Sequence, residues 1–198
     1  MDDYARALVS FFAIIDPIGN LLVFALLSRG LPRQLVVGMA GLSNAAALAT
    51  ISVFVFGGQE VLDYLDISEA SFQIAAGVLL LFPAYRLVEH GEPLARLADE
   101  GESAGPYQLA LVPLAIPLLA GPAALATAVT FGETSGRLTT LAAAATVLAG
   151  TTVLFVVSDA LVRVVGTPAL RVAARIVGVL LMAIAADLIV SGLDVVFE

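Results

Sequence analysis

Residues 11–24, FFAIIDPIGNLLVF, place an acid, a proline, a glycine and an amide inside a stretch that is otherwise apolar enough to cross a membrane. A carboxylate is costly in hydrocarbon, and a helix that is interrupted there leaves backbone groups without partners. Asp is a favoured residue to cap the start of a helix, and Pro is a favoured first residue within one. The pair Asp16-Pro17 therefore predicts that one helix ends and another begins in the middle of this span.

The composition of the whole chain indicates a membrane protein. Of its 198 residues, 60% are hydrophobic and 13% are charged, against about 45–50% apolar and about 25% charged residues in a typical soluble domain. A helix needs about 20 apolar residues to span a bilayer core. The sequence has six such segments, at 5–28, 34–57, 69–88, 107–131, 138–162 and 170–192. We expect an all-α membrane protein with six transmembrane helices in a single domain, 1–198.

The basic residues, all of them arginine, are distributed unevenly over the connections between these segments. If the N-terminus lies outside the cell, Arg6 and Arg137 lie outside and the other arginines lie inside, and cytoplasmic loops of membrane proteins carry an excess of basic residues. We therefore predict a multi-pass protein of the inner or plasma membrane with both termini outside and a cytoplasmic loop at 91–104. The formal charge of −8 argues against binding nucleic acid through a basic surface.

Matched breaks indicate an internal repeat. Asp16-Pro17 and Gly121-Pro122 lie 105 positions apart (121 − 16), each inside an apolar span. The halves 1–90 and 105–198 hold three helices each, so they enter the membrane from opposite sides, as in the inverted repeats of many secondary transporters. We expect helices 1 and 4 to be broken at mid-membrane. The halves also share a weaker similarity, between FQIAAGVLLLF in the first and ARIVGVLLMAI in the second. For this similarity, chance resemblance between helices rich in Ala, Leu and Val is the alternative.

Two helix starts that converge near mid-membrane form a site for an anion or a carboxylate, because their first N–H groups lack partners and the helix dipole is positive there. The candidate substrate-binding residues are Asp16, Pro17, Gly19, Asn20, Asn44, Ala120, Gly121, Pro122, Ala123 and Thr127. Asp16 is also the candidate for ion coupling. The alternative interpretation is that both breaks only kink their helices for packing, with Asp16 capping its own backbone.

The sequence shows no pattern typical of an enzyme. It contains no cysteine and a single histidine, His90, and it has no Ser-His arrangement and no glycine-rich phosphate loop. We expect no catalytic residues, no metal and no cofactor.

Three motifs carry a resemblance to a known family. DPIGN in the first helix, PLAIPLLAGPAAL in the fourth and RIVGVLLMAIAADLIVSGL in the sixth together resemble the MarC family of six-helix integral membrane proteins, over essentially the whole chain. The resemblance implies an inverted three-plus-three bundle and transport of small neutral amino acids such as alanine and glycine. The shared positions are Asp16, Pro17, Gly19, Asn20, Gly121 and Pro122.

Three positions depart from the family pattern. Ala123 stands where the second motif often has a further glycine, Gln73 where the third helix often has a basic residue, and Asp187 where the last helix often has glutamine. These departures bear on the choice of substrate and coupling ion.

The functional expectation is a secondary transporter of small neutral amino acids, coupled to H⁺ or Na⁺, that works by alternating access around a midplane site. Its partners are then a small zwitterionic substrate, the coupling ion and the lipid bilayer. The alternatives are an exporter of other small metabolites, a channel and a structural membrane subunit. The sequence predicts neither the direction of transport nor an oligomeric state.

Overall fold

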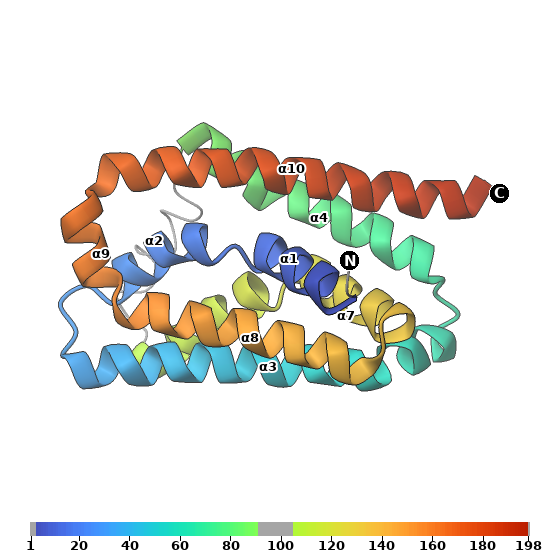
Figure 1. The fold of residues 1–198 in the computed structure, drawn as a ribbon, viewed down its shortest axis with the longest axis horizontal. Coiled ribbons are helices and arrows are strands. Elements are labelled where there is room, and N and C mark those ends of the chain that lie inside the picture. Colours follow the sequence, from blue (N-terminus) through green and yellow to red (C-terminus); the bar gives the residue numbers. More distant parts are fainter. Residues whose placement is uncertain (1–2, 91–104, 198) are drawn as a thin grey trace.

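The computed structural model describes residues 3–90 and 105–197. Within these ranges the regular structure is helical and no β-strand occurs, so the all-α prediction is confirmed. The predicted cytoplasmic loop 91–104 lies outside the described residues. The long helices form an elongated bundle in which they run up and down along one axis (Figure 1).

The first apolar segment consists of two helices on either side of Asp16. α1 covers Asp3–Ile15 and α2 covers Pro17–Leu27. The backbone of Asp16 has a φ of +48°, in the left-handed region that Asp adopts more readily than most residues. This conformation ends α1, and the fixed φ of Pro17 suits the first position of α2.

Two long helices complete the first half of the chain. α3 covers Arg33–Tyr64 and α4 covers Glu69–His90. The sequence predicts the second span to end near residue 57, but α3 continues to Tyr64. Glu60 and Asp63 are exposed in its last turns, so they end the apolar run without ending the helix.

The second half begins with a bent segment. It consists of α6 (Pro106–Leu109), η2 (Ala110–Leu119) and α7 (Pro122–Thr134). η2 is irregular, because Val112 and Ile116 have extended backbones and each precedes a proline, whose ring disfavours the helical conformation of the residue before it. α6 and η2 together meet α7 at an angle of 57°.

Three helices follow where the sequence predicts two. α8 covers Arg137–Val156, α9 covers Ser158–Val165 and α10 covers Thr167–Phe197. The predicted fifth helix, 138–162, is therefore divided at Val157, and α9 turns away from α8 at one end of the bundle (Figure 1).

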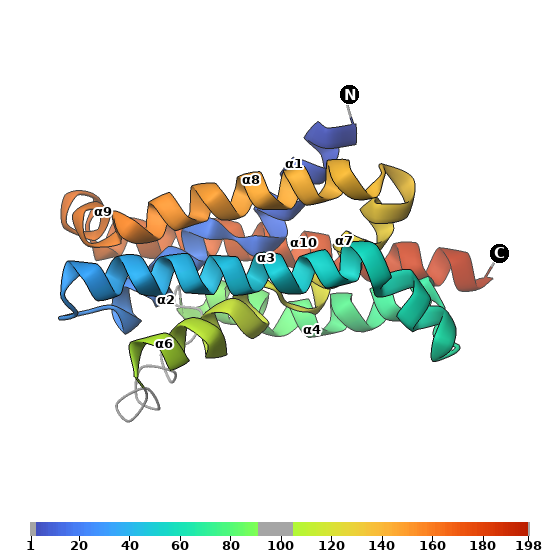
Figure 2. The same ribbon diagram turned by 90° about the horizontal axis from the view of Figure 1, so that it is seen from below.

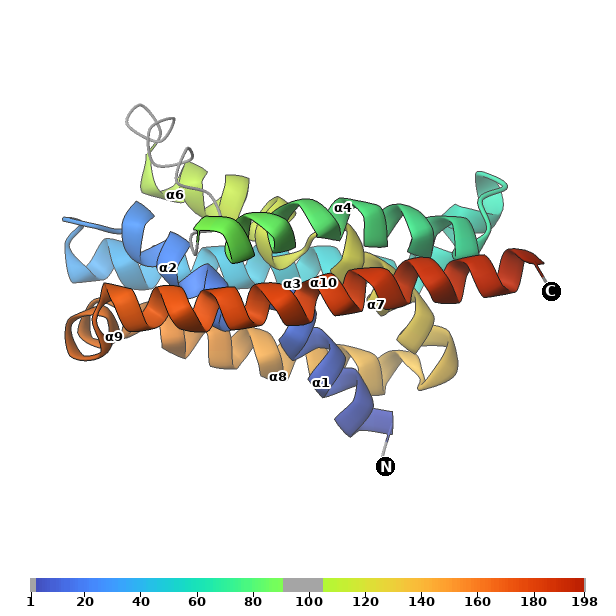
Figure 3. The same ribbon diagram turned by 90° about the horizontal axis from the view of Figure 1, so that it is seen from above.

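α4 and α10 lie side by side along most of their length (Figures 1 and 3). Glycines allow this close approach. A Cβ added to Gly77 of α4 would lie 2.7 Å from the carbonyl oxygen of Ala185, and one added to Gly178 of α10 would lie 2.8 Å from the Cβ of Leu87. Small residues at such contacts let membrane helices pack backbone against backbone.

α3 and α8 pack against each other, and each also packs against the broken segment of the other half. α8 contacts α1 and α2, while α3 contacts η2 and α7. Figure 2 shows α3 crossing the view with α8 on one side and α6 on the other. The rings of Phe24 in α2 and Phe155 in α8 stack with their centroids 4.3 Å apart, which anchors α2 to α8.

Among the described residues, five segments are long and apolar enough to cross a membrane, and one of them, Asp3–Ala25, is formed by α1 and α2 together. A sixth span results if the bent segment of α6, η2 and α7 counts as one. The two ends of the bundle differ in charge. The end that holds α9 and the α2–α3 connection carries Arg29, Arg33, Arg86, Arg171 and Arg175 among the described residues, while Arg6 and Arg137 lie toward the other end (Figure 1).

Candidate functional site

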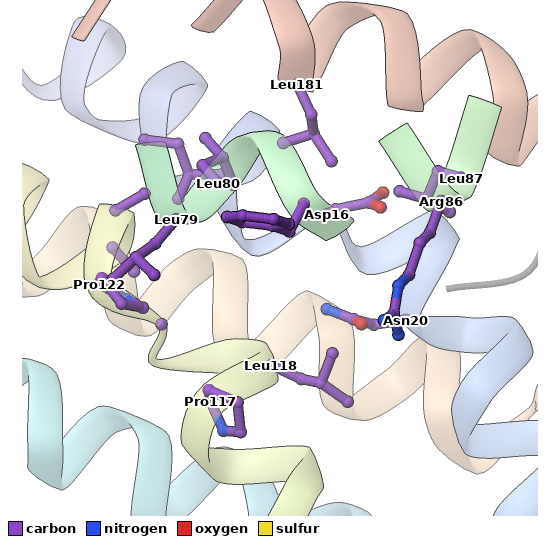
Figure 4. Close-up of a pocket in the computed structure, with 15 residues that line it drawn as sticks. Asp16, Asn20, Leu79, Leu80, Arg86, Leu87, Pro117, Leu118, Pro122 and Leu181 are labelled. Atoms are coloured by element: carbon purple, nitrogen blue, oxygen red, sulfur yellow. The ribbon is translucent and has the colours of Figure 1, made fainter. Parts of the chain in front are cut away.

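A cavity of about 420 Å³ lies where the two breaks meet α4. Its volume falls within the roughly 300–1,000 Å³ of pockets that bind small molecules. Its charged and amide lining residues are Asp16, Asn20 and Arg86 (Figure 4). The rest of the lining is Ile14, Leu79, Leu80, Phe82, Leu87, Pro117, Leu118, Gly121, Pro122, Ala123, Ala124 and Leu181.

Asp16 joins α1 to α2 and has only 6% of its surface exposed. Its N–H donates to the carbonyl of Phe12 at 3.1 Å, and its own carbonyl accepts the N–H of Asn20 at 3.0 Å. Its Oδ1 accepts the N–H of Gly19 at 2.8 Å, which is the geometry of a helix N-cap. A side chain at Gly19 would collide with the other carboxylate oxygen. One residue thus ends α1 and caps α2, with its carboxylate at the cavity.

Asn20 provides a hydrogen-bond donor for the end of α1, on the other side of Asp16. Its Nδ2 donates to the carbonyl of Ile15 at 2.7 Å. This carbonyl belongs to the last turn of α1, where carbonyl groups have no partner within the helix, and an unpaired carbonyl is unfavourable in hydrocarbon. The first break therefore contains its own hydrogen-bond partners, Asp16 for an N–H group and Asn20 for a carbonyl.

The start of α7 has no such partner. Its N-cap residue is Gly121, which offers no side chain, and the first N–H to bond into the helix is that of Leu125, to the carbonyl of Gly121 at 3.0 Å. No acceptor for the N–H groups of Ala123 and Ala124 is found in residues 3–90 and 105–197. Both residues are buried and line the cavity. The cavity therefore meets two open N–H donors at the positive end of a helix dipole.

α4 contributes a charged residue to the cavity, Arg86, which the pattern of arginines in the sequence assigns only to the cytoplasmic side. The side chain of Arg86 extends from α4 toward Asn20 (Figure 4). Leu79, Phe82 and Arg86 are separated by three and four residues, so they lie on one face of the helix. This spacing is the signal by which the sequence could have assigned them to one surface.

Half of the candidate residues from the sequence line this cavity, namely Asp16, Asn20, Gly121, Pro122 and Ala123. The others are buried but lie outside the lining, namely Pro17, Gly19, Asn44, Ala120 and Thr127. Asn44 donates from Nδ2 to the carbonyl of Ala40 at 2.9 Å within its own helix, and Pro17 lines a separate groove between α1 and α8.

A hydrogen-bonded triad joins α4 to α7. Thr130 Oγ1 donates to Glu69 Oε1 at 2.6 Å, and Gln73 Nε2 lies 3.0 Å from both oxygens. Along both helices, the triad lies between the cavity and the end of the bundle that holds the α3–α4 and α7–α8 connections (Figure 1). It ties the two helices together on the side of the cavity away from Arg86.

The fold is that of a helical membrane protein with several apolar spans, and a cavity lies between its helices. The model of the family described as MarC family integral membrane protein matches residues 1–197. The chain therefore belongs to the MarC family, and the resemblance seen in its three motifs is confirmed.

Relatives cover nearly the whole chain. A UPF0056 membrane protein of Methanocaldococcus jannaschii is 32% identical over 195 residues, which is 96% of this chain and 95% of that protein. The UPF0056 membrane protein YhcE of Escherichia coli is 30% identical over 203 residues, 98% of this chain and 93% of that protein. No solved structure matches the chain. The protein is thus an integral membrane protein with several transmembrane helices.

Proposed function

We propose that the protein is a secondary transporter of small neutral amino acids, such as alanine and glycine, and that the cavity between the two breaks is its substrate site. Transport proceeds by alternating access and is coupled to H⁺ or Na⁺. The observation that carries the proposal is the meeting of two helix starts at one cavity, where Asp16 closes the first start and the second is open. Import and export use the same site.

The open start of α7 supports a substrate with a carboxylate. In α2, the carboxylate of Asp16 accepts a backbone N–H. The matching position before α7 is Gly121, which has no carboxylate to offer. A substrate carboxylate that accepts the N–H groups of Ala123 and Ala124 completes this second cap in the way that Asp16 completes the first.

The carboxylate of Asp16 supports a positive charge on the same ligand. Asp16 is the acidic residue of the cavity lining, and one of its oxygens already accepts the N–H of Gly19. An ionised carboxylate has about four acceptor positions on its two oxygens, so capacity remains for an ammonium group or for the coupling cation. Asn20 uses one N–H of its Nδ2 for the carbonyl of Ile15, so its side-chain oxygen and its second N–H remain for the ligand.

Small residues form the wall of the cavity beside α7. Gly121, Ala123 and Ala124 contribute no side chain larger than a methyl group, so the ligand reaches the backbone N–H groups directly. A substrate with a small side chain fits between this wall and Asp16. Pro17, Gly19 and Ala120 lie outside the lining, and their role is to shape the backbone next to Asp16 and Gly121.

The packing of the helices supports an inverted repeat with breaks at mid-membrane. α1 and α2 pack on α8, and η2 and α7 pack on α3, which is the exchange of partners that a two-fold axis requires. Corresponding helices also run in opposite directions, α3 against α8 and α4 against α10 (Figure 1). Transporters built this way bind their substrates at the junction of the repeats, near half-helix ends.

The test is counterflow of labelled alanine, glycine and serine into proteoliposomes that contain the same amino acid unlabelled. Exchange distinguishes a carrier from a channel or a structural subunit. We expect the wild-type protein to exchange alanine and the cavity-filling variant Ala124→Leu to lose this activity. Gly41→Leu is the control, because a Cβ at this exposed position of α3 meets nothing within 4 Å. A wild-type protein that exchanges none of the three amino acids would refute the proposal.

A further inference from the structure

Arg86 brings a positive charge to the cavity and has no partner there. Its side chain is exposed and lines the cavity, and it forms no ion pair or hydrogen bond in the part of the chain that the structure describes. It lies one turn before the end of α4 at His90. Among residues 3–90 and 105–197, no hydrogen bond or ion pair occupies the five N–H donors of its guanidinium, so they are available to a ligand.

Asp16 and Arg86 place opposite charges at one cavity without pairing with each other among the described residues. A carboxylate and a guanidinium within reach normally form a short, charge-assisted contact. Their separation across a cavity leaves both of them for a ligand that carries both charges. An amino acid zwitterion has this pair of groups, an ammonium for Asp16 and a carboxylate for Arg86.

Arg86 and the start of α7 are two different positions for a carboxylate. Figure 4 places Arg86 and Pro122 on opposite sides of the cavity, with Asp16 between them in this view. Arg86 belongs to the last turns of α4, and this helix ends toward the end of the bundle that holds α9, while α7 leads away from the cavity toward the opposite end (Figure 1). A ligand held by its ammonium at Asp16 can direct its carboxylate to one side or to the other.

We infer that Arg86 is a second carboxylate-binding residue of the substrate site, which receives the zwitterion on the α9 side of the cavity and selects it over amines and amides. The inference rests on the proposed transport of amino acids. The ammonium group binds at Asp16 throughout, and the carboxylate passes from Arg86 to the open N–H groups at the start of α7. Arginine suits this position because its planar guanidinium binds both oxygens of a carboxylate at once.

The experiment compares alanine with alaninamide, which keeps the ammonium group and lacks the carboxylate, as competitors of labelled alanine exchange in proteoliposomes. Arg86→Gln is expected to raise the apparent KM for alanine roughly tenfold or more, since a charge-assisted hydrogen bond is lost, and to leave the maximal rate within about twofold. The inhibition constant of alaninamide should not change. Arg86→Lys keeps the charge without the planar guanidinium, so its apparent KM for alanine should lie between that of the wild type and that of Arg86→Gln.

Arg33→Gln is the matched control, because Arg33 is exposed at the same end of the bundle and lies outside the cavity. It should retain the wild-type KM and the wild-type preference for alanine. If Arg86→Gln keeps the wild-type KM and the wild-type preference for alanine over alaninamide, Arg86 only extends to the membrane surface and the inference is wrong. The proposed transport of amino acids is not affected by that result. If the wild-type protein exchanges no amino acid, the proposed function fails first.

Discussion

At the scale of a single residue, Asp16 provides hydrogen-bond partners where a helix is interrupted. Backbone groups without partners are unfavourable inside a membrane. Its left-handed backbone ends α1, its carbonyl starts α2, and its carboxylate caps an N–H group of α2. Asn20 then satisfies a carbonyl of α1. Asp16 and Asn20, which are unfavourable in an apolar segment, are therefore the hydrogen-bond partners of the backbone between α1 and α2. The carboxylate of Asp16 retains acceptor capacity for a ligand.

Substitutions at Asp16 should separate its structural role from its binding role. Asp16→Asn keeps a residue that tolerates a positive φ and caps a helix, so we expect a near-wild-type melting temperature in detergent but impaired ion-coupled alanine uptake. Asp16→Ala loses the cap and should destabilise the protein by about 1–2 kcal/mol. Asp66→Ala is the control, since Asp66 also has a positive φ, +55°, but lies outside the cavity. Unchanged ion dependence in Asp16→Asn would show that the carboxylate acts only as a cap.

At the scale of the elements, the junction between α1 and α2 and the junction between η2 and α7 differ in how their backbone groups are hydrogen-bonded. α1 and α2 form a break whose groups bond to one another. η2 and α7 form a break in which Pro113 and Pro117 interrupt the helical backbone and Gly121 provides no cap. At the start of α7, the N–H groups of Ala123 and Ala124 therefore have no acceptor among the described residues. The helix itself packs against α3 and α4.

The triad of Glu69, Gln73 and Thr130 should hold α7 against α4. We expect Thr130→Val to lower stability by about 1.5–3 kcal/mol, the contribution typical of a hydrogen bond to a charged group, measured by thermal unfolding in detergent. Thr134→Val is the control, because Thr134 Oγ1 is exposed and donates to the carbonyl of Thr130 within α7. Equal shifts in melting temperature for the two variants would show that the triad does not contribute.

At the scale of the whole molecule, the distribution of charge predicts how the bundle sits in the membrane. The end with α9 is rich in arginine, and the other end carries Glu60, Asp63, Asp66, Glu69 and Glu133. Cytoplasmic ends of membrane proteins are the basic ones. The arginine-rich end is therefore expected inside, with both termini outside.

This topology can be tested with the two ends of one helix, in a chain that has no cysteine of its own. Gln34→Cys lies at the start of α3 and Tyr64→Cys at its end, and both positions are exposed. A membrane-impermeant thiol reagent applied to intact cells should label position 64 and should reach position 34 only after permeabilisation. The reverse order of labelling would invert the topology.

The sequence allows the helix starts at Pro17 and Pro122 to be predicted, but it does not allow the complete cavity to be predicted, and the reason is physical. Asp16-Pro17 and Gly121-Pro122 act on their own backbone, so adjacent residues suffice to predict a helix start. Arg86 lines the cavity only because of the way α4 is rotated against the broken segments, which depends on contacts distant in sequence. Asn44 was a candidate by polarity alone, and its Nδ2 bonds within its own helix instead. Likewise, apolar runs predict spans and miss the division of α8 from α9.

The cavity that Asp16 and the start of α7 line is proposed to bind an amino acid, and thiol labelling of a lining residue tests this binding most directly. Leu80→Cys places a reactive group in the cavity, and Tyr64→Cys, at the end of α3, is the remote control. We predict that saturating alanine slows labelling at position 80 several-fold and leaves labelling at position 64 unchanged. Labelling of Leu80→Cys at the same rate with and without saturating alanine, glycine or serine would show that the cavity does not bind these amino acids.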